Sequence, residues 1–266
     1  VVFGTVIAAG SVGMFFFIPG IQALLDMFGW RETLVLMALF VALIPFVSSG
    51  LRVKAAGLGV GAAQSLREAV REARGHSGYV LLALGFFVCG FHVTFIATHF
   101  PAYLADNDVS VTAAAYAMGT IGLFNVIGAY AFGAAGDRFR KKNVLTLIYA
   151  SRAVLMTIIL LVPINDTTAI IFGAALGLFW LATVPLTSGI VAQVFGTRHF
   201  SMLFGVVFMS HQIGGFSGAW LGGLIFDATG SYDLMWAISA GLGLAAAILH
   251  WPISDQPLER LSDQTT

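Results

Sequence analysis

Long apolar runs that follow one another through the whole chain constrain its fold most strongly. A helix needs roughly 20 mostly apolar residues to cross a bilayer, whereas membrane strands are about 9–11 residues long and alternate apolar with polar residues. No such alternation occurs in runs such as residues 144–163. The sequence predicts an all-α membrane protein with eight transmembrane helices, at residues 1–25, 32–50, 78–100, 113–135, 143–163, 168–190, 202–226 and 233–251.

The composition agrees with a membrane protein and excludes several other classes. Of the 266 residues, 58% are hydrophobic and only 10% are charged, against about 45–50% and about 25% in soluble domains. Thirteen Lys and Arg residues balance 13 Asp and Glu residues, so a charge-driven nucleic-acid partner is excluded. Cys89 is the single cysteine, which excludes disulfides and a cysteine-based metal site. We expect the lipid bilayer as a partner, and no metal or cofactor.

The distribution of Lys and Arg predicts the orientation, because cytoplasmic loops accumulate these residues. With eight spans, both the segment 51–77 and the C-terminal tail 252–266 are predicted to be cytoplasmic. The opposite side has only Arg31, and Arg152 falls inside a span. The cations on the predicted cytoplasmic side are Arg52, Lys54, Arg67, Arg71, Arg74, Arg138, Arg140, Lys141, Lys142, Arg198 and Arg260.

The segment 51–77 differs from the other breaks in its length and charge. Ala63, Leu66, Val70 and Ala73 share one helical face, and charged residues cover the rest. This pattern predicts a short amphipathic helix at the membrane surface, with Ser65 as its N-cap. We interpret it as a linker; a regulatory or partner-binding role is the alternative.

An internal repeat relates the first predicted span to the seventh at a constant offset of 201 residues. Repeated halves are a common design of secondary transporters. We expect residues 1–50 to be the last two helices of an N-terminal half, and residues 78–251 to be a complete six-helix C-terminal half. The missing part would then begin about 120 residues before Val1, by the repeat period. The matched pairs are Gly4 and Gly205, Gly13 and Gly214, Asp26 and Asp227, and Gly29 and Gly230.

The loop between the fourth and fifth predicted spans contains the motif Gly-Ala-Ala-Gly-Asp-Arg-Phe-Arg-Lys-Lys, residues 133–142. This motif resembles the G-x-x-x-D-R-x-G-R/K-R/K signature of the major facilitator superfamily, with Arg140 in place of the second glycine. The resemblance implies the last eight helices of a twelve-helix carrier. An acid beside cations at a helix end can hold two helices together in one carrier state. The predicted conformational gate is Gly133, Asp137, Arg138, Lys141 and Lys142; an ordinary positively charged loop is the alternative.

Further motifs are similar to the bacterial monocarboxylate-carrier and oxalate–formate-like branch of that superfamily. They are residues 10–13 with Pro19, residues 28–31, residues 210–215 and residues 226–232. This resemblance implies a multi-pass protein of the bacterial inner membrane that is monomeric once its N-terminal helices are present. It also implies alternating-access transport of a small organic anion, monocarboxylate-like, with proton symport as a further hypothesis.

Several polar residues lie within the predicted spans, where they are rare and point to function. In the superfamily, the first, second, fourth and fifth helices of each half contribute to the central cavity, and these residues fall on the corresponding spans. A cavity wall is one interpretation, and hydrogen bonds between helices are the other. The candidates for the substrate and ion pathway on these spans are His92, His99, Asn125, Trp180, Thr183, Thr187, His211 and Gln212.

Arg152 completes the predicted pathway and is its most unusual member. It lies nine residues past Asn143, or roughly 13–14 Å along a helix, and so near the middle of the membrane. Insertion there costs about 2.5–3.5 kcal/mol, and no acidic residue of the sequence lies mid-span to neutralise it. A substrate carboxylate is one candidate partner; helix carbonyls, or bracing of the fourth span, are the other.

His92 and His99 are seven residues apart and so lie on one helix face. Histidine ordinarily titrates near pH 6.5, which suggests proton coupling, while permanently neutral imidazoles are the alternative. Other functions weighed are a drug or metabolite exporter and a non-transporting receptor on a carrier scaffold. An enzyme is not expected, because H-E-x-x-H, G-x-S-x-G and paired intramembrane carboxylates are missing from the sequence.

Overall fold

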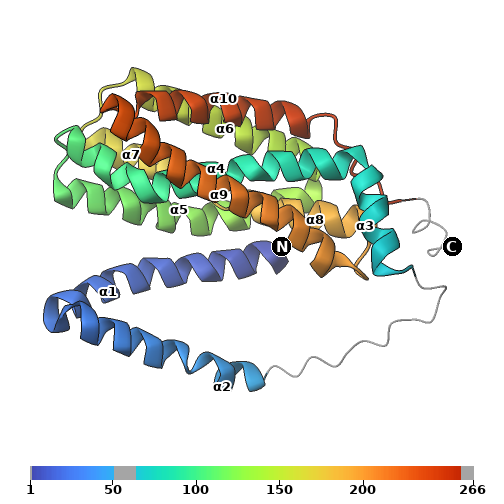
Figure 1. Ribbon diagram of the computed structural model, residues 1–266, viewed down its shortest axis with the longest axis horizontal. Coiled ribbons are helices and arrows are strands. Elements are labelled where there is room, and N and C mark those ends of the chain that lie inside the picture. Colours follow the sequence, from blue (N-terminus) through green and yellow to red (C-terminus); the bar gives the residue numbers. More distant parts are fainter. Residues whose placement is uncertain (1, 51–63, 259–266) are drawn as a thin grey trace. The chain divides into compact units, whose positions relative to one another are not determined.

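The computed structural model describes residues 2–50 and 64–258, and in these residues every regular element is a helix. Arg52, Lys54, Arg260 and the end of the tail fall outside the described residues. The chain divides into two compact units, Val12–Ala63 and the remainder. The helices are α1 (Val2–Val41), α2 (Ile44–Ser49), α3 (Leu66–Gly75), α4 (Ser77–Asp106), α5 (Val111–Arg138), α6 (Lys141–Leu161), α7 (Asp166–Phe179), α8 (Thr183–Phe195), α9 (Phe200–Thr229) and α10 (Asp233–His250) (Figure 1).

The smaller unit is a helical hairpin whose turn lies where the sequence predicts a break. Gly29 has φ 77° and ψ 176° inside α1, so the helix direction changes there. Only glycine adopts this region readily. The Thr33 hydroxyl donates to the Gly29 carbonyl (2.7 Å), and the rings of Phe17 and Phe40 pack edge to face across the hairpin with centroids 5.1 Å apart. Gly230, the repeat partner of Gly29, also has a positive φ (69°) and ends α9.

Six helical segments of the described residues are long and apolar enough to cross a membrane. α9 is not among them, because His211, Gln212 and its glycines lower its mean hydropathy. The predicted count of eight spans is therefore not confirmed, although the all-helical membrane architecture is. The six segments are Met27–Val47, Ser77–Asp106, Val111–Arg138, Lys141–Leu161, Asp166–Phe195 and Asp233–His250.

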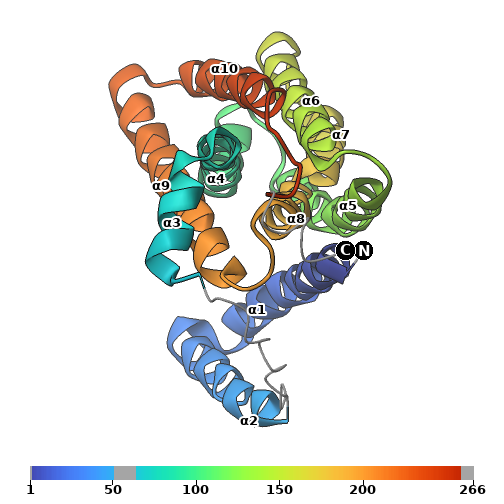
Figure 2. The same ribbon diagram turned by 90° about the vertical axis from the view of Figure 1, so that its right-hand side faces the viewer.

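In the larger unit, helices α4 to α10 pack as three principal pairs. α4 lies along α9, α5 along α7, and α6 along α10 (Figures 1 and 2). The first three helices correspond to the last three in chain order: α4 to α7–α8, α5 to α9, and α6 to α10. Under this correspondence the α4–α9 pair becomes the α7–α5 pair, and the α6–α10 pair is its own counterpart. This is the internal symmetry expected of two three-helix repeats.

Glycines allow the α4–α9 and α5–α7 pairs to approach until one backbone touches the other. A methyl group on Gly90 would overlap the His211 carbonyl oxygen, and one on Gly214 would overlap that of Phe87. The second pair repeats this arrangement, since a methyl on Gly128 would overlap the Leu178 carbonyl oxygen. Small residues have this role in membrane bundles because they let backbones come close.

The predicted linker helix is present as α3, and its N-cap is confirmed. The Ser65 hydroxyl accepts from the Glu68 backbone N–H (3.3 Å), and the Ser65 backbone N–H donates to the Glu68 carboxylate (2.8 Å). These bonds hold the pKa of Glu68 below its usual value. Of the predicted apolar face, Ala73 is buried, Val70 is half-buried and Leu66 is 47% exposed, while Ala63 lies outside the described residues; Ala69 is buried as well. The two small alanines let α3 lie close to its neighbours.

Candidate functional site

Arg152 of α6 is the central residue of the candidate site, and it is buried (1% exposed). Its Nε donates to the Phe179 carbonyl (3.1 Å), and its Nη2 donates to the carbonyls of Phe179 (2.6 Å) and Trp180. The guanidinium carbon lies 5.7 Å from the centre of the Tyr149 ring. Of the two interpretations offered by the sequence, hydrogen bonding to helix carbonyls describes this geometry.

The carbonyls that Arg152 binds belong to a break in the predicted sixth span. α7 ends at Phe179 and α8 begins at Thr183. Pro185 explains the break, because proline has no N–H to donate to the Leu181 carbonyl and its ring would clash with that carbonyl. The sequence run 168–190 contains no charged residue and no second proline.

Two further side chains bind the break from other helices. The Asn125 side-chain oxygen on α5 accepts from the Leu181 backbone N–H (2.8 Å). The Cys89 sulfur on α4 lies 3.1 Å from the Thr183 hydroxyl oxygen. Asn125, Thr183 and Trp180 were predicted as pathway residues, and the structure brings all three to the break. No role for Cys89 follows from the sequence, because a thiol in an apolar run has no local signal that distinguishes a functional residue from a packing residue.

The histidines of α4 bind backbone carbonyls on neighbouring helices. His92 Nε2 donates to the Ser239 carbonyl of α10 (2.8 Å), and His99 Nε2 donates to the Ala219 carbonyl of α9 (2.8 Å). His99 Nδ1 also lies 3.2 Å from the Tyr232 hydroxyl. Hydrogen bonds between helices therefore account for one nitrogen of His92 and both nitrogens of His99.

The His211–Gln212 pair on α9 faces two environments. The His211 ring is buried against Phe86 and Phe208, with centroid distances of 4.8 Å and 5.2 Å, and its Nδ1 lies 3.1 Å from the Gln212 side-chain oxygen. Gln212 itself is exposed and lines an open cleft of about 520 Å³ with Trp220 and others. Gln212 thus lies on a cleft surface, apart from the break.

The buried charge within the described helices is positive and is not balanced by a buried acidic residue. Among the described residues, the buried Asp, Glu, Lys and Arg side chains are Arg152 and Asp255, and Asp255 lies beyond the end of α10. Thr187 of α8 is also buried, and within the part of the chain that the structure describes its hydroxyl has no hydrogen-bond partner. The candidate site is therefore a buried polar cluster with a positive centre.

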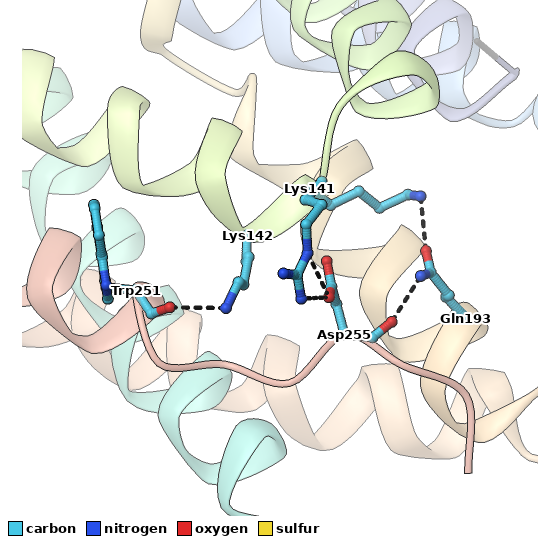
Figure 3. Close-up of polar contacts among 6 residues, drawn as sticks. Lys141, Lys142, Gln193, Trp251 and Asp255 are labelled. Carbon is cyan, nitrogen blue, oxygen red and sulfur yellow. Dashed lines mark hydrogen bonds and ion pairs between the residues drawn. The ribbon is translucent and has the colours of Figure 1, made fainter. Parts of the chain in front are cut away.

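The predicted gate lies at the bundle end where α5 stops and α6 begins. Gly133 is buried, while Asp137 and Arg138 are exposed. Lys141 Nζ donates to the Gln193 side-chain oxygen of α8 (2.9 Å), and Lys142 Nζ donates to the Trp251 carbonyl after α10 (3.0 Å), as Figure 3 shows. The two lysines thus connect the start of α6 to the end of α8 and to the segment that follows α10.

Arg140, which replaces the signature's second glycine, makes the main ion pair of this region. Its φ of −60° and ψ of 122° are accessible to any residue, so glycine is not needed here. Its Nη2 lies 2.5 Å, and its Nε 3.2 Å, from one carboxylate oxygen of Asp255, and this carboxylate raises the pKa of Arg140. The Asp255 backbone carbonyl accepts from the Gln193 side chain (2.7 Å) (Figure 3). No local pattern predicts Asp255, because it lies 115 residues from Arg140.

Comparisons with known proteins agree with this architecture. The family model of the Major Facilitator Superfamily matches residues 82–265. An uncharacterized MFS-type transporter, YcxA of Bacillus subtilis (strain 168), is 31% identical over 182 residues, covering 66% of this chain and 44% of the relative. Monocarboxylate transporter 12 of Mus musculus is 24% identical (93% of this chain, 58% of the relative), and monocarboxylate transporter 13 of Bos taurus is 23% identical (99% and 63%).

The chain thus spans about half the length of the curated relatives it matches. The family-model match begins within α4 and extends past α10, and it includes the gate motif and the helix break. The chain is a multi-pass membrane protein that belongs to the major facilitator superfamily, a family of transporters rather than enzymes.

Proposed function

We propose that this chain is part of a secondary active transporter for a small, monocarboxylate-like organic anion, working by alternating access. The observation that supports the charge of the substrate is the buried guanidinium of Arg152, with no acidic side chain buried in the spans of the described residues. A positive centre in a low-dielectric surrounding attracts anions without having to touch them. The relatives named monocarboxylate transporters support the substrate class.

Competition for uptake tests this proposal. The full-length protein is reconstituted in proteoliposomes, and uptake of a labelled monocarboxylate is challenged with unlabelled monocarboxylates, organic cations and neutral sugars. We expect the monocarboxylates alone to reduce uptake. Inhibition by cations or sugars alone would contradict an anion carrier and favour an exporter of the same superfamily.

The proposal includes an orientation and a gate. Positive residues gather at the bundle end that holds α3 and the start of α6, which favours the cytoplasmic side of a bacterial inner membrane for this end. The C-terminal tail follows α10 at the same end. Asp137 and Arg138, with Lys141 and Lys142, would then form a cytoplasmic gate.

The proposal also includes proton symport, and His99 is the best candidate for the residue that holds the proton. His99 is half-buried, and its Nδ1 faces a hydroxyl that can either donate or accept, so the ring can hold a proton without leaving a bond unmade. We expect uptake by the parent protein to rise as external pH falls, because an inward proton gradient would then drive the anion. His99→Gln should flatten this profile.

The matched control is His199→Gln, because this histidine precedes α9 and lies outside the proposed pathway. Its pH profile should follow that of the parent. The pH profile of uptake is also measured for His92→Gln. An unchanged pH profile in both the His99 and the His92 variants would remove proton coupling from the proposal.

A further inference from the structure

The break between α7 and α8 leaves backbone groups without helical partners in the middle of a span. The last carbonyls of α7 and the first N–H groups of α8 lose their partners in this way. In a membrane, such groups must be satisfied by protein, because no bulk water is available. Here side chains of two other helices supply the bonds: Arg152 of α6 binds the carbonyls of Phe179 and Trp180, and Asn125 of α5 binds the N–H of Leu181.

The geometry of the Arg152 guanidinium directs its donors at the helix break. Two of its three nitrogens, Nε and Nη2, point at the carbonyls of the break, while the buried Nη1 has no hydrogen-bond partner among the described residues. Bidentate recognition of a carboxylate needs two parallel N–H donors of the guanidinium fork. With Nε and Nη2 occupied, that fork is not free for a substrate.

The position of α8 links the break to the gate. α8 has 13 residues, so it is about 20 Å long. Its first residue, Thr183, lies at the break, and Gln193 near its end accepts from Lys141. Along the same helix, the side chain of Lys141 packs on Gly189, where an added methyl would meet its Cε at 2.9 Å. A shift of α8 at the break therefore moves the contacts of the gate.

We propose that Arg152 and Asn125 act as a pair of positioning residues, the Arg152–Asn125 clasp, which fixes the start of α8 and through α8 the gate. Arg152 then affects transport through the helix break and not by binding the substrate carboxylate. The inference rests on the proposed function only for its transport measurement. The clasp itself is tested without any substrate.

Cys89 provides the substrate-independent measurement. It is the single cysteine of this chain and is fully buried, and its sulfur contacts Thr183 at the start of α8. Displacement of α8 exposes this thiol to N-ethylmaleimide, and mass spectrometry of the Cys89 peptide gives the labelling rate in the full-length protein. Labelling reports local opening of the structure around the break.

The decisive comparison is Arg152→Gln with Arg152→Met. The Nε2 of glutamine occupies the same place along the side chain as the arginine Nε, so it can donate to the Phe179 carbonyl without any charge. Methionine has a similar length and no donor. We expect Cys89 labelling to be at least about tenfold faster in Arg152→Met, which loses all of the charge-assisted bonds. In Arg152→Gln labelling should stay within about threefold of the parent, because one hydrogen bond to the Phe179 carbonyl is kept, although it is no longer charge-assisted.

The transport measurement separates positioning from substrate binding. The clasp predicts that Arg152→Met lowers the maximal uptake rate with little change in KM, and that Arg152→Gln restores most of this rate. A substrate-binding arginine predicts instead a KM raised equally in both variants, restored only by Arg152→Lys. That second pattern would overturn the inference while leaving an anion carrier intact.

A second variant keeps the test valid if Arg152→Met does not fold. Asn125→Ala removes the acceptor for the Leu181 N–H and leaves Arg152 in place, and it too should accelerate Cys89 labelling. Arg198→Gln, at an exposed arginine before α9, is the control and should label as the parent does. Parent-like labelling in Asn125→Ala, or in a folded Arg152→Met, would overturn the clasp.

Discussion

Gly214→Leu is expected to abolish close packing of α4 on α9 and to lower the melting temperature of the detergent-solubilised protein substantially. Even a methyl at this position would overlap the Phe87 carbonyl oxygen, which is backbone and cannot rotate away. Overpacking costs about 1–3 kcal/mol and occasionally more. A cost near 3 kcal/mol corresponds to a fall of about 6–12 °C for a protein of this size.

Gly205→Leu is the matched control, because Gly205 lies in the same helix and an added methyl there has no atom of the described residues within 4 Å. The same side chain is introduced into the same helix, so differences in helix propensity cancel. We expect this variant to melt at or above the temperature of the parent, since leucine favours a helix over glycine. Equal losses in the two variants would show that the glycine contact does not hold α4 and α9 together.

The second prediction with a large effect is that the two partners of the Arg140–Asp255 ion pair differ in the stability that is lost when each is replaced. The Asp255 side chain is 4% exposed and the Arg140 side chain is 51% exposed. Removing Arg140 leaves a buried carboxylate without its cation, which costs about 3 kcal/mol. Removing the charge of Asp255 leaves an arginine that water can solvate, so this loss is much smaller. Arg140→Met should therefore be markedly less stable than Asp255→Asn.

Thermal melting of the two variants measures this difference directly. Arg198→Met serves as the control for replacing an exposed arginine by methionine, and it should melt as the parent does. If Asp255→Asn is destabilised as much as Arg140→Met, the carboxylate does not depend on Arg140 in the way the geometry indicates, and the segment after α10 is held by its other bonds.

The membrane architecture could be predicted because it depends on local composition. Apolar runs of about 20 residues specify helices wherever hydrocarbon is the solvent, and Gly29 and Gly230 mark helix ends that the sequence also shows. The family followed from the short motif at residues 133–142, and the comparisons confirm it. The count of eight spans remains a prediction.

The contacts of the candidate site could not be predicted, because they depend on pairs far apart in the chain. The run 168–190 was interpreted as one helix, although Pro185 forbids the bond that would make it continuous. Arg152 was recognised as unusual, but its partners are backbone carbonyls, and every residue has one. Asp255 was assigned to a tail, since its partner Arg140 is distant in sequence.

The part of the site that remains a prediction concerns function. Neither His92 nor His99 has a carboxylate partner among its described hydrogen bonds, and both bind carbonyls that a structural histidine would equally bind. Gln212 lines an open cleft, which fits a pathway residue. Transport measurements on variants of these residues distinguish a role in the pathway from a structural role.

Counterflow in proteoliposomes is the most direct test of a carrier that alternates between two faces of a membrane. Vesicles containing the full-length protein are preloaded with a high concentration of an unlabelled monocarboxylate and diluted into a trace of the labelled one. An alternating-access carrier predicts transient accumulation of label above its external concentration. Label that enters but only equilibrates would contradict alternating-access exchange. Label that binds without entering would contradict transport and leave a receptor on a carrier scaffold.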